Sequence, residues 1–280
     1  MVKTAETLSI RETYKLLNIA IATAKLKELR TPYAKIRPSL HTVLIGKPGT
    51  LKSSILYEIC DKLKTTPHFN LTAANIVGSV DSSTGEPMLP AIWEARDSIL
   101  AIDDFNVDKD HPAVRNGLRI LLSVLENPEY QKKISYRVND YSKKTKGLYC
   151  IMKNGTIKVK TRFVLVANTM NELHKPQKMV ELEALRTRCL TIPYYPSIDE
   201  TIEFIQGKNR FEYEDYPMES KVKVPLNVFN KIIELVKTNK VIQTDFVRTI
   251  GDCCRVYAVV GDDDDVFESI IKLKHRGGRD

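Results

Sequence analysis

Four short apolar runs limit what this chain can fold into more than any other feature. They span residues 42–45, 99–102, 163–167 and 189–192, and each is followed directly by Gly, Asp, Asn or Pro. Runs of this length without polar alternation are typical of strands that are buried on both faces. Segments with helical periodicity separate them, so the pattern predicts an α/β fold with a parallel sheet between layers of helices.

Helical patterns also lie toward both ends of the chain. Apolar residues recur at helical spacing in residues 5–35, as far as Pro32. Beyond residue 196 the strand pattern stops. Residues 225–275 contain three helical patterns, the last of which follows four aspartates that can cap it. The expected organisation is an N-terminal helical segment (1–35), an α/β core (36–196) and a small helical lid (197–280).

Composition excludes several classes of protein. The chain has 280 residues, of which 42% are hydrophobic and 28% charged, a balance typical of globular proteins. No run approaches the ~18 apolar residues of a membrane span, and the N-terminus is too polar for a secretory signal. The five cysteines show neither a C-x-x-C pair nor zinc-ligand spacing with histidine. We therefore expect a cytoplasmic protein with free thiols and no membrane partner.

The positive charge of the chain is concentrated in residues 131–162. This segment has ten basic residues and one acidic residue, a net charge of +9, whereas the rest of the chain sums to −1. Such a concentration is typical of a nucleic-acid contact, although a solvated basic loop has the same composition. Asn154-Gly155 between two alternating runs predicts a β-hairpin here. The residues expected to bind DNA, single-stranded or duplex, are Lys132, Lys133, Arg137, Lys143, Lys144, Lys146, Lys158 and Lys160.

A glycine-containing loop, G-K-P-G-T-L-K-S, joins the first apolar run to a predicted helix at 54–64. In this context a P-loop surrounds phosphates with backbone N–H groups at a helix N-terminus. The standard pattern is G-x-x-x-x-G-K-[ST], and Leu51 stands here where the second Gly is usual. A plain strand–turn–helix with a capping serine is the alternative. The expected ATP-binding residues are Gly46, Lys47, Pro48, Gly49, Thr50, Leu51, Lys52, Ser53 and Ser54.

Polar residues at the ends of the next two runs extend this prediction. Lys52 would contact the β and γ phosphates, and the Ser53 hydroxyl would bind Mg²⁺. Asp103 would hold the same Mg²⁺, directly or through water, and Asp104 would orient the attacking water. Exposed acids that cap a helix are the alternative. Asn168, at the end of the third run, would position the water or contact the γ-phosphate.

Two arginines, Arg186 and Arg188, precede the fourth run. An arginine in this place can act across a subunit interface as a finger on the γ-phosphate. Either residue alone could equally be an ordinary arginine at a helix end, and local sequence does not decide between the two.

In their order and spacing these motifs resemble the core of the minichromosome-maintenance (MCM) helicases, in the helix-insert branch of the AAA+ ATPases. The loop at 46–53 resembles the MCM loop, in which a small residue replaces the second Gly. Residues 81–86 with Leu89 resemble the helix-2 insert, and residues 102–105 resemble the I-D-E-F strand end. Residues 131–135 resemble the start of the pre-sensor hairpin.

The resemblance continues toward the C-terminus and assigns roles there. Ala167-Asn168 resembles sensor 1. Thr187-Arg188-Cys189 matches the S-R-F finger and so favours Arg188 over Arg186. Phe246-Val247-Arg248, with Arg255, resembles the lid helix in which the first arginine, Arg248, is sensor 2. Residues 266–273 resemble the final helix.

By this resemblance the fold is an AAA+ sandwich with β-hairpin insertions and a C-terminal helical lid. The protein would form a homo-oligomeric ring, commonly a hexamer, with ATP between subunits. Arg188 and Arg248 would come from the neighbouring subunit, and the basic hairpins would line a channel and grip DNA.

Three departures from the family pattern bear on function. Asp104 replaces the usual Glu, so its carboxylate is one methylene shorter and hydrolysis is expected to be slower. The family's N-terminal DNA-binding domain has no counterpart in residues 1–35. About 20 residues around 137–154 do not align with the family hairpin.

Three functions therefore compete. The first is an ATP-driven DNA motor, either a reduced MCM-like helicase or a replication-initiation ATPase. The second is an ATP-binding switch or loader with little hydrolysis, which the shorter Asp104 would favour. The third is an AAA+ protein remodeller, against which the concentrated basic segment argues.

Overall fold

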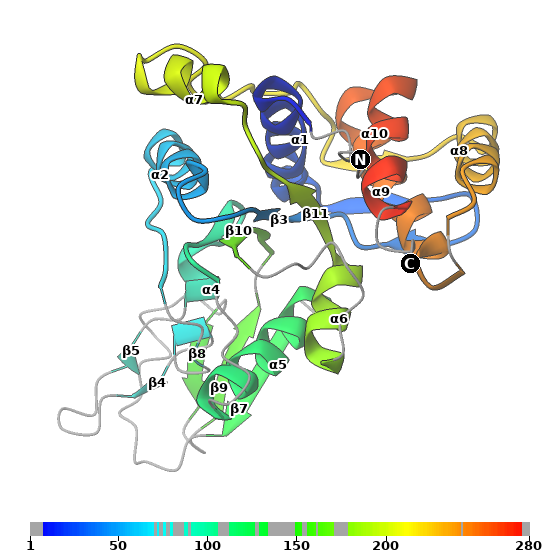
Figure 1. Ribbon diagram of the computed structural model, residues 1–280. Helices are drawn as coiled ribbons and strands as arrows, with labels where there is room; N and C mark the ends of the chain where they lie inside the picture. Colours follow the sequence, from blue (N-terminus) through cyan, green and yellow to red (C-terminus); the bar gives the residue numbers. More distant parts are fainter. Residues whose placement is uncertain are drawn as a thin grey trace.

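A four-stranded parallel sheet forms the centre of the computed structural model (Figure 1). The structure describes residues 8–69, 72, 75–76, 79–80, 87–88, 91–105, 112–126, 129–133, 149–152, 156–160, 162–170, 179–241 and 243–275. The strand order is β11-β3-β10-β6, and all neighbours are parallel. The strands are β3 (His41–Ile45), β6 (Ile99–Ile102), β10 (Val164–Thr169) and β11 (Cys189–Pro193). The predicted α/β fold is confirmed, because each strand coincides with one of the four apolar runs.

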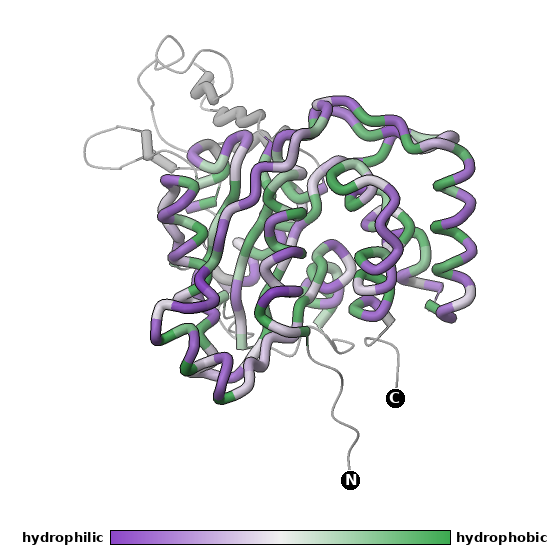
Figure 2. Tube along the Cα trace, turned by 90° about the horizontal axis from the view of Figure 1, so that it is seen from above, coloured by the Kyte–Doolittle hydropathy of each residue, from purple (hydrophilic) through white to green (hydrophobic). Residues whose placement is uncertain are grey.

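Helices cover both faces of this sheet, which explains why its strands lack polar alternation. One face, which includes Leu44 and Val166, packs against α1 (Ile10–Ala22) and α2 (Lys52–Leu63). The other face, which includes Val43 and Leu165, packs against the second layer of helices. That layer comprises α4 (Ala91–Glu94), α5 (Pro112–Glu126) and α6 (Val180–Arg188). In Figure 2 the hydrophobic colour accordingly concentrates along the strands and the adjoining sides of the helices.

The prediction of one helix over 5–35 is wrong beyond residue 22. Helix α1 begins at Ile10, after a capping box in which Ser9 and Glu12 bond to each other's backbone, and it ends at Ala22 before a short 3-10 turn. The chain then forms β1 (Glu28–Arg30), which pairs antiparallel with β2 (Lys35–Ile36) and parallel with β12 (Lys221–Lys223). This distant partner decides the local structure over a weak helical pattern.

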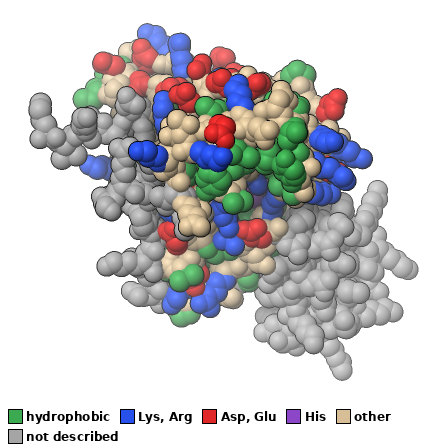
Figure 3. Space-filling model, turned by 90° about the vertical axis from the view of Figure 1, so that its right-hand side faces the viewer, with side chains coloured by type: hydrophobic (Ala, Val, Ile, Leu, Met, Phe, Trp, Pro, Cys, Tyr) green, Lys and Arg blue, Asp and Glu red, His purple; other side chains and the backbone are tan. Residues whose placement is uncertain are grey.

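Strand β12 also corrects the expectation that strands stop after residue 196. The three helical patterns expected in 225–275 correspond to α8 (Leu226–Thr238), α9 (Gln243–Val260) and α10 (Asp264–His275). A further helix, α7 (Ile198–Ile205), precedes them, and residues 206–220 form no helix. The acidic run at 262–265 overlaps the start of α10, and Asp263, directly before the helix, accepts a hydrogen bond from the Val266 N–H. Helices α8, α9 and α10 share one hydrophobic core with α1 and one face of the sheet. Figure 3 faces the side of the molecule where these helices lie, and acidic and basic side chains are mixed there with hydrophobic ones.

Two small antiparallel sheets lie at the bottom of Figure 1, away from α7 and α8. One joins β4 (Ser79–Val80) to β5 (Pro87–Met88). The other has the order β7-β9-β8, formed by β7 (Glu129–Lys133), β8 (Tyr149–Met152) and β9 (Thr156–Lys160). Strands β8 and β9 flank Asn154-Gly155, so the predicted hairpin is confirmed. No helix in the described part of the chain combines the length and the hydropathy that a membrane span requires.

Candidate nucleotide-binding site

The loop between β3 and α2 has the backbone conformation of a glycine-rich turn, although it contains few glycines. Gly49 has a φ of 77°, and Leu51, directly before α2, has a φ of 63°. Leu51 thus adopts the left-handed conformation that the second Gly of the standard pattern adopts without strain. For a non-glycine residue this conformation costs about 1–2 kcal/mol, and such strain concentrates at functional sites.

The start of the loop is tightly enclosed by the ends of neighbouring strands. The Gly46 N–H donates a hydrogen bond to the Thr169 carbonyl at 3.2 Å. A Cβ atom at Gly46 would lie 2.5 Å from the carbonyl oxygen of Tyr194, which is backbone and cannot move aside cheaply. Only glycine therefore fits here without displacement of the loop.

Lys52, the first residue of α2, folds its side chain back over the loop. Its Nζ donates to the Lys47 carbonyl at 2.7 Å and to the Thr50 hydroxyl at 3.1 Å, and the residue is only 7% exposed. Burial lowers its pKa, and the carboxylates of Asp104 and Asp103 partly offset that effect. The Lys52 amine therefore lies inside the turn, close to two carboxylates. Phosphate oxygens can replace the Lys47 carbonyl and the Thr50 hydroxyl as its hydrogen-bond acceptors.

Ser53, Asp103 and Asn168 form a hydrogen-bonded cluster at the C-terminal edge of the sheet. The Ser53 hydroxyl donates to Asp103 Oδ1 at 2.8 Å. The Asn168 Nδ2 donates to the same oxygen at 2.6 Å and to Ser53 Oγ at 3.4 Å. Asn168 occupies this position because β10 lies between β3 and β6. Ligands of open parallel sheets bind at this edge, where successive connections diverge.

The backbone of Asp104 is held by the same cluster. Its N–H donates to Asn168 Oδ1 at 2.7 Å and to Asp103 Oδ1 at 3.0 Å, and its φ is 49°. The Phe105 N–H in turn donates to the Asn168 carbonyl at 2.7 Å. Asn168 thus fixes both adjacent aspartates, so the structure brings together Lys52, Ser53, Asp103, Asp104 and Asn168, as the sequence predicted.

The oxygen atoms of Ser53 and Asp103 fit a shared Mg²⁺. Neighbouring ligands of an octahedral Mg²⁺ lie about 2.9 Å apart, close to the 2.8 Å between these atoms. The described residues contain no group of three or more His, Cys, Asp or Glu that could hold a metal. An ion here would therefore take its other ligands from phosphate and water, as Mg²⁺ commonly does.

Sequence reasoning missed two neighbours of this cluster on α2. Burial and the nearby Asp103 carboxylate raise the pKa of the Tyr57 hydroxyl, and they raise the pKa of the Cys60 thiol to about 12. Tyr57 follows Ser53 by four residues, one helical turn, and this spacing was the available signal. Cys60 is buried and its raised pKa keeps it an unreactive thiol.

The structure separates the two candidate arginines. Arg186 is 4% exposed and pairs with Glu183 at 2.7 Å and with the buried Asp245 at 3.1 Å, which ties α6 to α9. Arg188 is more accessible, with 23% of its side chain exposed, and lies 2.6 Å from Glu126. Arg186 is thus committed to the protein interior, whereas Arg188 can be reached from outside.

Arg188 and Arg248 lie at the opposite edge of the sheet from the loop. Arg188 immediately precedes Cys189, which pairs with His41 at the start of β3, whereas the loop follows the end of β3. A strand of five residues spans about 16 Å. Arg248 accompanies Arg188, because its guanidinium lies 3.7 Å from the same Glu126 oxygen. The fold therefore does not bring these arginines to the loop of their own chain.

The predicted DNA-binding residues are only partly described. Lys132 and Lys133 lie in β7, and Lys158 and Lys160 lie in β9, opposite Gln131 and Glu129. The remaining residues of that set, Arg137, Lys143, Lys144 and Lys146, lie outside the described residues, as do residues 81–86 of the insert.

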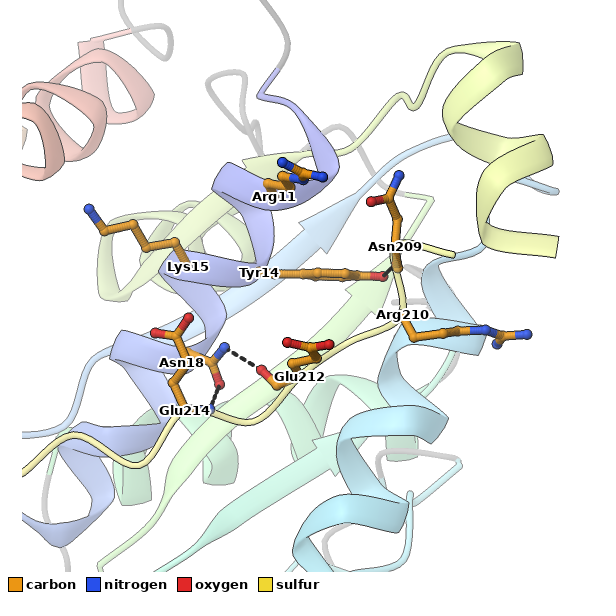
Figure 4. A pocket seen from close by; sticks show the side chains of 8 residues that line it. All are labelled: Arg11, Tyr14, Lys15, Asn18, Asn209, Arg210, Glu212 and Glu214. Atoms are coloured by element: carbon orange, nitrogen blue, oxygen red, sulfur yellow. Dashed lines mark hydrogen bonds between the residues drawn. The ribbon is translucent and has the colours of Figure 1, made fainter. Parts of the chain in front are cut away.

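A separate hollow of about 520 Å³ lies between α1 and residues 209–214 (Figure 4). The Tyr14 hydroxyl donates to the Asn209 carbonyl, and the Asn18 amide bonds to the backbone of Glu212 and Glu214. These bonds hold the extended segment against α1, and none of the lining residues belongs to the loop cluster. We interpret this hollow as structural.

Comparison with known protein families and with curated proteins finds no match for this chain. Its function is therefore inferred from the geometry of the site and from its sequence motifs.

Proposed function

We propose that this chain is an ATPase that binds ATP and Mg²⁺ at the 46–53 loop and works as an MCM-like AAA+ motor on DNA. The observation that carries nucleotide binding is the 2.8 Å contact between Ser53 and Asp103, which Asn168 completes beside the loop. The conformation of Leu51 supports it, because the backbone takes the glycine form of the standard pattern despite the substitution.

In this proposal each residue has a distinct task. The loop N–H groups bind the phosphates, and the Lys52 amine exchanges the Lys47 carbonyl for β- and γ-phosphate oxygens. Ser53 and Asp103 hold Mg²⁺, which supplies positive charge against the charge that develops on the phosphates. Asn168 fixes the backbone of Asp104, whose carboxylate orients the attacking water.

The positions of the arginines support assembly of the chain into a ring. Because Arg188 and Arg248 lie about one strand length from the loop, they can reach a nucleotide only on another copy. A head-to-tail ring, hexameric by the family resemblance, meets this requirement. Residues 197–280 would act as the lid, and the +9 segment that contains β7, β8 and β9 would bind DNA in the channel.

One observation favours a second candidate, an ATP-binding switch with slow turnover. Asp104 is a methylene shorter than the family Glu, and the two hydrogen bonds that its N–H donates hold its backbone against a compensating movement. A misplacement of ~1 Å can lower a rate by ~10²-fold. Substitution Asp104→Glu should then raise turnover, whereas a chain already tuned as a motor would gain little.

ATP hydrolysis with and without single-stranded and duplex DNA tests the proposal. Lys52→Ala should abolish hydrolysis, and Lys62→Ala, an exposed lysine on the same helix, serves as the matched control. We expect DNA to stimulate the wild-type protein and the control. Binding of a fluorescent ATP analogue without turnover would favour the switch, and absence of binding would overturn both.

A further inference from the structure

A single carboxylate holds both arginines that face outward from the edge opposite the loop. Glu126 Oε1 lies 2.6 Å from Arg188 Nε and 3.7 Å from an Arg248 guanidinium nitrogen. The three side chains come from α5, α6 and α9, and each is partly exposed. Among the described residues, neither arginine has an ion pair with another carboxylate.

This carboxylate lies in surroundings that are otherwise strongly positive. Arg37 and Arg255 lie nearby, and burial, together with the Arg255 charge, lowers the pKa of Arg37 to about 10. Arg255 itself pairs with Asp252 at 2.6 Å. Without Glu126, Arg188 would lie beside Arg37 and Arg248 with no paired carboxylate among the described residues to compensate their charges, and it would keep the hydrogen bond that its Nη1 donates to the Ala184 carbonyl at 3.0 Å.

The ion pair between Arg188 and Glu126 can also be replaced by a contact between Arg188 and a phosphate. Arg188 Nε makes no hydrogen bond, so its contact with Glu126 is an ion pair without hydrogen-bond alignment. Arg188 Nε itself is buried, but 48% of the Glu126 side chain is exposed, and a phosphate offers more charge and aligned acceptors than this unaligned pair. A phosphate brought by another copy can therefore take the arginines from Glu126.

Glu126 also lies next to the basic sheet along the chain. It is the last residue of α5, and β7, the first strand of that sheet, begins at Glu129. The preceding Leu125 is 2% exposed in the core, so the end of α5 is anchored. Only two residues separate this anchored helix end from β7, so Glu126 is the described residue of α5 that lies nearest to the sheet along the chain.

We propose that Glu126 is a positioning residue that couples the β7–β9–β8 sheet to Arg188 and Arg248. It orients both arginines in each protomer, and DNA bound at the sheet alters how they are presented to the nucleotide of the next copy. This inference rests on the proposed function, and it adds a residue that contacts neither the DNA nor the nucleotide of its own chain.

The test compares Glu126→Gln, which removes the charge and keeps the shape, with Glu126→Asp, which keeps the charge. Glu234→Gln, an exposed partner of Lys237 on α8, is the matched control. Steady-state ATPase activity is measured over ATP concentration with and without DNA, DNA affinity is measured separately, and thermal melting checks folding.

We expect the factor by which DNA raises kcat to be about fivefold smaller, or more, in Glu126→Gln than in the wild-type protein, a typical size for coupling between sites. KM and DNA affinity should stay near wild type, and Glu126→Asp should restore part of the loss.

The outcomes separate this inference from the proposed function. If the wild-type protein shows no DNA stimulation, the proposed function and the coupling both fail. Stimulation that persists in a folded Glu126→Gln protein overturns the coupling alone. A loss of DNA affinity or a rise in KM, in place of a change in kcat, also overturns it, because Glu126 would then act on binding.

Discussion

At the residue scale, Gly46 is the position where the space around one atom matters most. A Cβ would meet the Tyr194 carbonyl at 2.5 Å, Thr50 Oγ1 at 3.0 Å and Lys52 Cδ at 3.4 Å. The first of these atoms belongs to the end of the sheet, and the other two belong to the loop. The loop itself must therefore move if the side chain grows.

We expect Gly46→Ala to weaken ATP binding by about tenfold or more, because a displaced loop no longer matches the phosphates. Binding of a fluorescent nucleotide measures the effect. Gly207→Ala is the control, since Gly207 has a φ of 80° and open space around it, and so carries only backbone strain. Equal affinity of Gly46→Ala and wild type would show that the loop does not hold phosphate.

His41 makes stability depend on pH. It is buried, and its Nδ1 accepts a hydrogen bond from the Leu165 N–H at 3.0 Å. Burial lowers the pKa of His41 well below its usual value, and the charges of Arg37 and Arg255 lower it further. In the folded state the ring therefore stays neutral while the unfolded chain takes up a proton below about pH 6.5.

Because the unfolded state binds the extra proton, stability must fall as the pH drops below about 6.5. Between about pH 7.5 and 5.5, protonation of His41 in the unfolded chain should lower the free energy of unfolding by about 1.4 kcal/mol. His41→Asn keeps an acceptor for Leu165 and does not titrate. The free energy of unfolding, measured by urea denaturation, should therefore differ between wild type and this variant by an amount that changes by about 1.4 kcal/mol between about pH 7.5 and 5.5. A constant difference would mean that His41 takes up its proton over the same pH range in the folded and the unfolded protein.

At the element scale, β7 and β9 carry part of the basic segment on a paired framework. The register places Lys158 and Lys160 opposite Gln131 and Glu129. We expect the double substitution of Lys158 and Lys160 by Ala to weaken DNA binding and to reduce its salt dependence. Each lost phosphate contact lowers the slope of log affinity against log salt by about 0.7–0.9.

Fluorescence anisotropy over a salt series measures this slope. The control replaces Lys208 and Lys240, two exposed lysines outside the segment, by Ala and should leave the slope unchanged. If both double variants changed the slope equally, DNA binding would be a property of overall charge and not of this sheet.

The connection between α6 and α9 distinguishes the two arginines of α6. Arg186 neutralises Asp245, which is 0% exposed, whereas Arg188 pairs at the surface. Removing one member of a buried pair costs about 3–5 kcal/mol, and an exposed pair contributes about 0–1 kcal/mol. We expect Arg186→Met to destabilise the protein strongly in urea unfolding and Arg188→Met to have little effect. Similar losses for both would place Arg188 in a structural role as well.

At the scale of the whole molecule, the loop and the outward arginines lie at opposite edges of one sheet. In the head-to-tail ring proposed above, each active site would combine the loop of one copy with the arginines of the next. We expect Lys52→Ala and Arg188→Ala proteins to be inactive alone and active when mixed. In an equal mixture about a quarter of the interfaces join an intact loop to an intact arginine.

Steady-state hydrolysis across mixing ratios measures this recovery. Arg186→Met in place of Arg188→Ala is the comparison variant, since its defect lies in folding and mixing should not rescue it. Recovery would be absent if Arg188 acted within its own chain.

Much of the candidate site could be predicted from sequence because its signals are local. The strands containing Val43 and Leu165 are apolar because both faces of the sheet are covered, and this requirement is visible in any short window. The polar residues Asp103 and Asn168 directly end such runs, and Ser53 begins the helix after the loop. The carboxyl ends of parallel strands lie at one edge of the sheet, so the proximity of these polar residues followed from the strand assignments alone.

Contacts between distant segments could be decided only by the tertiary structure. The strand at Glu28–Arg30 exists because it pairs with Lys221–Lys223, and nothing in its own sequence shows this partner. The choice between Arg186 and Arg188 depends on Asp245 in another helix, and the meeting of Arg188 with Arg248 depends on Glu126 in a third. Sequence by itself determined which segments are buried and where polar groups end them, because burial and backbone geometry act over a few residues. The tertiary structure decided which charges meet, because electrostatic pairing depends on distance in space and not on separation along the chain.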